Sequence, residues 1–261
     1  MRCTASIRWT TPLIESSEVL LAKGGGETEK QIYRFTKGDS DLSLRFDLTV
    51  PLAKYVAQHY GELTFPFRRF QIGKVYRGER AQRGRFREFY QADIDVIGDG
   101  KLDIINEAEV PSIIYKTFTS LGLQRFKIRI NNRKVLNGFF AILGLTEKAG
   151  DVMRTIDKLE KIGAEKVKTI LVEDFGVEAA TADELLKFIE TPGAPRVSSR
   201  RWRATRAGRG IRPRRRGAEN GCNLYAAFGV PADHFEIDLT IARGLDYYTG
   251  TVYETAMLDH P

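Results

Sequence analysis

Residues 76–97, YRGERAQRGRFREFYQADIDVI, are the stretch from which the fold can be predicted. Both ends carry the β-branched and aromatic residues that are typical of strands. The first sixteen residues nevertheless hold five arginines and two glutamates. Because a charge that leaves water is costly unless a partner compensates it, these residues are unsuited to an ordinary core. The stretch predicts two strands joined by a polar loop, with charges that serve another purpose.

The returning strand, residues 87–97, separates into two faces because side chains alternate along a strand. One face is apolar, and the other carries Gln91, Asp93 and Asp95. A polar face can simply meet water, as one side of an antiparallel sheet often does. Charges of both signs also recur at the ends of other predicted strands, at Arg45, Asp47, Arg77, Arg243 and Asp246. That recurrence favours a cleft in which carboxylates hold an ammonium group and arginines hold carboxylate or phosphate.

Composition limits the classes of protein that need to be considered. The net charge of +7 comes from one segment, because residues 196–216 contain ten arginines and no acid, and removing them leaves −3. The two cysteines, Cys3 and Cys222, form no disulfide framework or zinc signature, and the three histidines lack metal-ligand spacing. No apolar run is long enough to span a bilayer. We therefore expect a cytoplasmic protein with no membrane partner and no metal-binding residues.

The pattern along the chain predicts an α+β fold with a helical insertion. Strands are expected at 29–36, 42–50, 67–78, 87–98 and 124–132, and a strand–turn–strand unit at 234–255. Helices are expected at 48–61, with Thr49 as the N-cap, and at 103–123, where Pro111 should bend or break the helix. The division we predict is 1–133, a helical insertion with an arginine-rich tail at 134–217, and a return segment at 218–261.

The arginine-rich segment 194–217 has no periodicity that could order it. It is compatible with a basic arm for RNA, with a solvated loop, or with a GC-rich gene read out of frame. We expect residues 196–216 to have no stable packing in the fold.

Three stretches resemble motifs of known enzymes. VYRGERAQRGRFREFYQADIDVIG at 75–98 resembles the second signature motif of class II aminoacyl-tRNA synthetases. RGLDYYTGTVYE at 243–254 resembles the histidine-specific motif of the histidyl-tRNA synthetase family, and LSLRFDLTVPLAKY at 42–55 resembles that family's amino-acid-binding stretch. The resemblance implies an antiparallel sheet flanked by helices, and an enzyme that activates histidine with ATP, and with magnesium, before transfer to tRNA(His).

The resemblance also implies a role for nine residues. Arg77 would hold the α-phosphate of ATP and the substrate carboxylate, Glu79 would lie near the adenine, and Arg85 would reach the γ-phosphate. Arg243 would be an additional catalytic arginine. The remaining residues would contact histidine: Asp47, Thr49 and Gln91 at its ammonium group, and Asp95 and Tyr248 at its imidazole.

The sequence departs from the family pattern in three places. Phe46 stands where the family usually has proline, and the first class II motif, which builds the homodimer of the complete enzyme, matches only from residue 11 onward. The chain stops before the third motif and the anticodon-binding domain, so we expect a fragment that is inactive alone. Two rival functions remain open: a regulatory subunit of ATP phosphoribosyltransferase that shares the fold, and an RNA-binding protein built on the arginine run.

Overall fold

The computed structural model describes residues 6–22, 26–80, 82–190, 225–241 and 248–259. Its contacts divide the chain into Met1–Leu102 and Asp103–Pro261, here called unit 1 and unit 2. The arginine-rich segment and Arg243 both lie outside the described residues. None of the described helices is both long and apolar enough to cross a bilayer.

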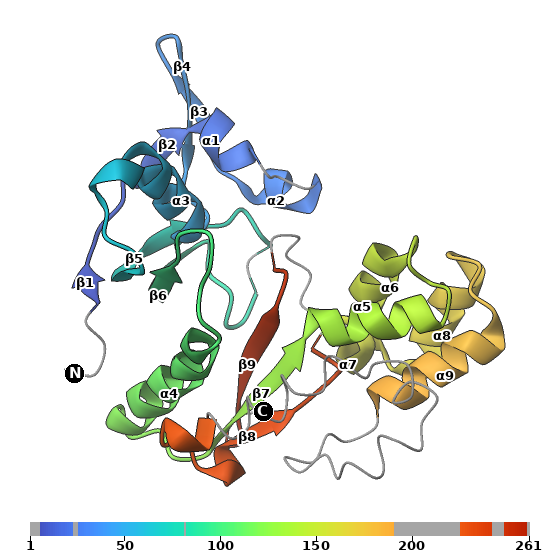
Figure 1. The fold of residues 1–261 in the computed structure, drawn as a ribbon. Coiled ribbons are helices and arrows are strands. Elements are labelled where there is room, and N and C mark those ends of the chain that lie inside the picture. Colours follow the sequence, from blue (N-terminus) through green and yellow to red (C-terminus); the bar gives the residue numbers. More distant parts are fainter. Residues whose placement is uncertain (1–5, 23–25, 81, 191–224, 242–247, 260–261) are drawn as a thin grey trace. The chain divides into compact units, whose positions relative to one another are not determined.

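Unit 1 contains two three-stranded sheets with short helices around them (Figure 1). Its strands are β1 (Ile7–Arg8), β2 (Ile14–Ser16), β3 (Arg34–Lys37), β4 (Ser40–Leu44), β5 (Phe67–Tyr76) and β6 (Glu88–Ile97). Its helices are α1 (Ser17–Leu21), α2 (Gly26–Gln31), α3 (Thr49–Gln58) and the 3-10 turn η1 (Tyr60–Glu62). The sheet orders are β1-β5-β6 and β2-β4-β3, and only the β1-β5 pair is parallel.

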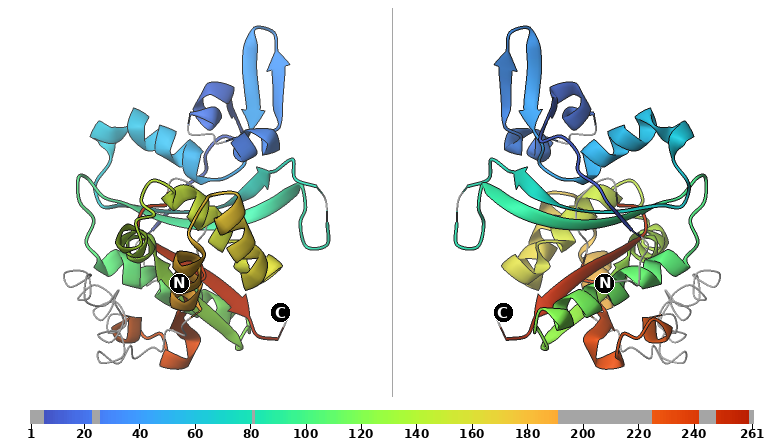
Figure 2. Two further views of the ribbon diagram at one scale, coloured as in Figure 1. Left: turned by 90° about the vertical axis from the view of Figure 1, so that its right-hand side faces the viewer. Right: turned by 90° about the vertical axis from the view of Figure 1, so that its left-hand side faces the viewer.

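The β5–β6 ribbon is the longest pairing in unit 1, and both views of Figure 2 show it as a twisted pair of strands. The strands predicted at 67–78 and 87–98 are thus confirmed. Gly38 and Asp39 form the turn that joins β3 to β4, and Gly38 has a φ of 58°, which glycine adopts without strain. The strand predicted at 29–36 is partly wrong, since α2 continues to Gln31 and only Arg34–Lys37 pairs with β4.

Helix α3 begins at Thr49, the residue that was predicted to be its cap. Thr49 is already the first helical residue, and the side-chain oxygen Oδ1 of Asp47 accepts a hydrogen bond from the Val50 amide at 3.0 Å. Pro51 lies in the first turn, where its missing N–H costs nothing. The capping side chain is therefore Asp47, and Thr49 as N-cap was wrong.

Unit 2 combines one sheet with a group of helices. Its elements are α4 (Ile105–Ser120), β7 (Phe126–Asn132), α5 (Arg133–Ile142), α6 (Ala149–Ile156), α7 (Leu159–Ile162), α8 (Ala164–Glu173), α9 (Ala179–Ile189), the 3-10 turn η3 (Ala232–His234), β8 (Phe235–Ile237) and β9 (Thr251–Met257). Strand β7 lies between β8, which runs parallel to it, and β9, which runs antiparallel. Both units therefore confirm an α+β fold in which antiparallel pairs dominate; the domain boundaries stay a prediction.

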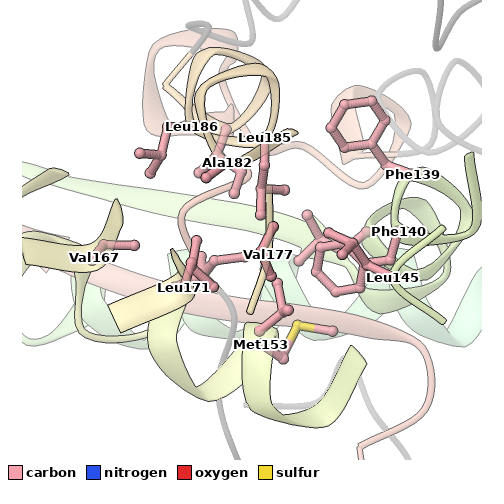
Figure 3. Packing of buried hydrophobic residues seen from close by; sticks show 14 of the residues in the cluster. Phe139, Phe140, Leu145, Met153, Val167, Leu171, Val177, Ala182, Leu185 and Leu186 are labelled. Atoms are coloured by element: carbon pink, nitrogen blue, oxygen red, sulfur yellow. The ribbon is translucent and has the colours of Figure 1, made fainter. Parts of the chain in front are cut away.

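Helices α5, α6, α8 and α9 enclose an apolar cluster, which we call the helical core (Figure 3). Their apolar residues recur at helical spacing, so each helix has one face to bury. The fully buried members include Phe140, Leu171 and Leu185, all at 0% exposure. This core is composed of apolar side chains, and it accounts for the helical character predicted from residue 134 onward.

Helix α4 continues through Pro111, so the expected break does not occur. Proline lacks the N–H that would bond to the carbonyl four residues earlier, which belongs to Glu107. In the structure the hydroxyl of Tyr253, on β9, donates to that Glu107 carbonyl at 2.6 Å. The sheet therefore supplies the donor that the helix lacks.

Candidate active site

The polar side of the β5–β6 ribbon brings six positions together through its register. Gly73 pairs with Gln91, Gln71 with Asp93, and Arg69 with Asp95. The side expected to be apolar is the exposed one, because Ile72 is 64% exposed and Tyr90 is 67% exposed. Arg69 and Gln71 are fully buried. The ribbon thus encloses its polar face, and the simple water-facing interpretation was wrong.

Arg45 packs against this face and is held by main-chain oxygens. Its Nε donates to the Lys74 carbonyl at 2.8 Å, and its Nη1 donates to the Thr11 carbonyl at 2.7 Å. A Cβ at position 73 would lie 2.7 Å from Nη2 of Arg45, so only glycine leaves room for the guanidinium. Burial lowers the pKa of Arg45. Because its donors are used by the backbone, Arg45 serves the framework of the site.

Asp47 reaches the site from the turn before α3 and is 4% exposed. One oxygen caps the helix, and the other, Oδ2, has no hydrogen-bond partner among the described residues. Burial raises the pKa of Asp47, while the Val50 amide and the charge of Arg77 oppose that rise. Such a carboxylate can accept a hydrogen bond from a cationic ligand.

Asp95 lies further along β6, and its Oδ2 is 2.8 Å from Nε of Arg69. This contact is an ion pair whose geometry does not satisfy a hydrogen bond. Burial raises the pKa of Asp95 to about 6, Arg69 opposes the rise, and Asp93 and Asp47 add to it. Gln91, also on β6, has a buried Oε1 with no partner among the described residues. Several acceptors on this face are therefore available to a ligand.

Arg77 follows β5 and connects the site to the segment before α3. Its Nε donates to the Phe46 carbonyl at 3.1 Å, and its guanidinium carbon lies 5.2 Å from the centre of the Phe89 ring. Arg85 and Glu79 form an ion pair at 3.1 Å in the loop between the two strands. The predicted phosphate-binding residues thus lie at the loop end of the ribbon, between the last residue of β5 and the first residue of β6.

The remaining predicted residues are placed less closely. Thr49 is exposed at the start of α3. Tyr248 belongs to unit 2, is 40% exposed, and its carbonyl accepts a hydrogen bond from Arg133 at 2.9 Å. Arg243 lies outside the described residues. The structure therefore brings together Asp47, Arg77, Gln91 and Asp95 within unit 1, and we describe Tyr248 only within its own unit.

Sequence reasoning did not single out Arg69 and Gln71, which are both buried on the polar face of the ribbon. Both lie on β5 at positions that alternate with Phe70 and Ile72. The alternation of two polar residues with two apolar residues was the available signal, because it places a cation opposite Asp95 once the strands are paired.

Comparisons with known proteins identify the family. The sequence profile of the histidyl-tRNA synthetase family matches residues 8–257. The chain is 56% identical over 254 residues to a histidine–tRNA ligase of Clostridium tetani, covering 96% of this chain and 57% of the relative. A histidine–tRNA ligase of Xanthomonas campestris is 47% identical over 277 residues, with 58% of its length covered.

Solved structures show the same fold. The histidyl-tRNA synthetase from Nostoc sp. PCC 7120 matches with a TM-score of 0.85 and 39% identity, over 98% of this chain and 58% of that chain. A Bacillus halodurans C protein, titled ATP phosphoribosyltransferase regulatory subunit/histidyl-tRNA synthetase, matches with a TM-score of 0.78 and 22% identity, which shows the fold alone. The Clostridium tetani and Xanthomonas campestris relatives are histidine–tRNA ligases, which are aminoacyl-tRNA ligases. The chain belongs to the histidyl-tRNA synthetase family, and it spans less than three-fifths of the length of the curated relatives it matches.

Proposed function

We propose that this chain carries the histidine-binding part, and some of the ATP-binding part, of a histidine–tRNA ligase. The observation that supports this best is the buried Asp47 carboxylate, whose Oδ2 has no partner among the described residues. It lies on the same side of the ribbon as the unpartnered Oε1 of Gln91. Two acceptors of this kind suit the ammonium group of an amino acid, which has only donors.

In this proposal the side chains divide between two parts of histidine. Asp47 and Gln91 accept hydrogen bonds from the ammonium group, with Thr49 beside them, while Asp95 accepts one from an imidazole N–H. With a pKa of about 6, Asp95 is mostly ionised at neutral pH and is therefore an acceptor. Tyr248 would bind the same ring, as the motif match implies.

The arginines serve the second substrate. The histidine carboxylate attacks the α-phosphorus of ATP, a new O–P bond forms, and pyrophosphate leaves. Arg77 stabilises the charge that builds on the α-phosphate, Arg85 binds the γ-phosphate, and Glu79 lies near the adenine. Arg243 would add a second cation. The described residues contain no group of three or more His, Cys, Asp or Glu that could hold a metal ion.

Transfer of the histidyl group to tRNA(His), and a homodimer, are proposed only for a protein of the relatives' length, because the chain spans 57% of the Clostridium tetani ligase. The test compares the 261-residue chain with that ligase. Histidine binding is measured by calorimetry and adenylate formation by ATP–pyrophosphate exchange.

We expect this chain to bind histidine weakly and to exchange pyrophosphate more slowly than the ligase does. If the ligase has even one preorganised transition-state contact that this chain lacks, that difference alone should slow exchange by about two to three orders of magnitude. The histidine-site proposal fails if histidine up to about 10 mM produces no binding signal. A dissociation constant above that concentration corresponds to a binding free energy weaker than about −4 kcal/mol. Exchange within about tenfold of the ligase would show that the segments beyond this chain matter little.

A further inference from the structure

Among the described residues of unit 1, Arg69 is the most buried charged residue, at 0% exposure. It lies on β5, directly opposite Asp95 in the register of the ribbon. Burial lowers the pKa of Arg69, and the charges of Asp95, Asp93 and Asp47 oppose that effect. A buried guanidinium is costly unless its donors are used. The groups that contact the Arg69 guanidinium therefore indicate which parts of the site it holds in place.

Its three nitrogens contact three different segments. Nη2 donates to the Leu48 carbonyl at 2.9 Å, Nη1 donates to Oε1 of Gln71 at 3.1 Å, and Nε lies 2.8 Å from Oδ2 of Asp95. Leu48 stands between Asp47 and Thr49, so one planar fork holds both the turn before α3 and the C-terminal part of β6. Arginine suits this task because its donors lie in a fixed plane.

Charged groups face Arg69 from every element packed against it. Asp93 and Asp95 approach from β6, Asp47 approaches from the turn before α3, and Arg45 is the neighbouring cation. None of the proposed ligand contacts requires Arg69 itself. Its position beneath them indicates that it acts through them.

We propose that Arg69 is a positioning residue of the amino-acid site, whose guanidinium fixes the Asp95 carboxylate relative to the Asp47–Thr49 turn. This rests on the proposed function, in which Asp47 and Asp95 contact histidine. If the side chain at position 69 loses its charge, Asp95 loses a cation that opposes the effect of burial, and the pKa of Asp95 should rise above its value of about 6.

The test uses the 261-residue chain with Arg69→Met and Arg69→Lys. The carboxyl group of Asp95 is followed by 13C NMR against pH, with Asp95→Asn used to assign its signal, and histidine affinity is measured at neutral pH. The matched control is Arg68→Met, which removes the adjacent arginine from the opposite side of the same strand.

In Arg69→Met we expect the Asp95 midpoint to rise by about one unit, and we expect histidine affinity to fall by about tenfold or more. Arg69→Lys keeps a charge and should hold the midpoint near that of the parent protein, with a smaller loss of affinity, whereas Arg68→Met should change neither. An unmoved midpoint in folded Arg69→Met would overturn the proposal, even if that variant unfolds more easily.

Two further outcomes are informative. If Arg69→Met does not fold, the double variant Arg69→Met/Asp95→Asn removes both charges, and recovery of folding would support the pairing, whereas no recovery together with full histidine affinity in Arg69→Lys would contradict it. If the parent chain binds no histidine, the proposed function fails, while the NMR midpoint still decides whether Arg69 controls Asp95.

Discussion

The helical core of unit 2 and the polar side of the β5–β6 ribbon in unit 1 bury opposite kinds of side chain. The helical core contains fifteen buried residues, all of them apolar. The ribbon buries Arg69 and Gln71 at 0% exposure and has Arg45 and Asp47 beside it at 4%. Apolar burial stabilises without demanding orientation, whereas buried polar groups must be aligned to offset their desolvation. The comparison teaches that stability and ligand geometry are concentrated in different parts of this chain.

The largest effect on stability should come from the helical core. Leu171→Ala, at a position with 0% exposure, should lower the free energy of unfolding by about 2–5 kcal/mol because it leaves a cavity. The measurement is denaturant unfolding followed by far-ultraviolet circular dichroism. Leu121→Ala is the control, since Leu121 is 70% exposed and the same truncation there should have little effect. Equal losses in the two variants would contradict the division drawn above.

Asp47→Asn should produce the reverse pattern. The amide oxygen can still accept from the Val50 amide, and a buried charge is removed, so unfolding should not become easier. Histidine affinity should fall by about 2–4 kcal/mol, because the ammonium group loses its charged acceptor. Calorimetry compares it with Asp39→Asn, which alters an exposed turn residue. A variant that binds histidine like the parent protein would remove Asp47 from the site.

The ribbon should also respond to pH through Asp95. Its pKa is raised to about 6 in the folded chain, from about 4 when unfolded. Asp95 therefore stays protonated to higher pH in the folded state than in the unfolded state. The stability that its protonation contributes is complete below about pH 4 and is lost as the pH rises through 6. Asp95→Asn lacks this dependence. Its stability relative to the parent protein should increase by about 2 kcal/mol between pH 4 and pH 7, and a constant difference in urea unfolding would refute the assignment.

The smallest effect on stability should be found at the loop of the ribbon. Arg85 is 55% exposed and pairs with Glu79 at 3.1 Å. Arg85→Ala should therefore change the free energy of unfolding by less than about 1 kcal/mol. Affinity for a non-hydrolysable ATP analogue should nevertheless fall by about tenfold, because a phosphate contact is lost. Glu79→Gln separates the two causes, since it removes the ion pair and keeps the arginine. Unaltered affinity in Arg85→Ala would exclude Arg85 from the phosphate site.

The long strands and helices could be predicted because their patterns are local. The alternation in residues 67–78 and 87–98 predicted β5 and β6 to within about two residues at each end. Alternation does not say which face is covered, and here the polar one is. Arg69 was overlooked for this reason. A second reason is that its partner Leu48 is distant in sequence. The motifs suggested Asp47, Gln91 and Asp95, whereas the ion pair between Arg69 and Asp95 could be found only from the structure.

Local rules failed where a distant residue changed the outcome. The helix propensity of residues 29–31 was hidden by the apolar and aromatic residues that follow, so a strand was predicted too early. Pro111 should have interrupted α4, but the Tyr253 hydroxyl from β9 replaces the missing amide donor.

That replacement has a consequence for how the sequence can change over generations. A lineage that exchanges Tyr253 for phenylalanine deprives the Glu107 carbonyl of its donor, and the loss is harmless only where residue 111 has already regained an amide hydrogen. Conversely, proline can arise at 111 with little penalty only in a background that already has tyrosine at 253. The order of the two mutations therefore matters, and positions 111 and 253 should be inherited as a pair across descendants of this sequence.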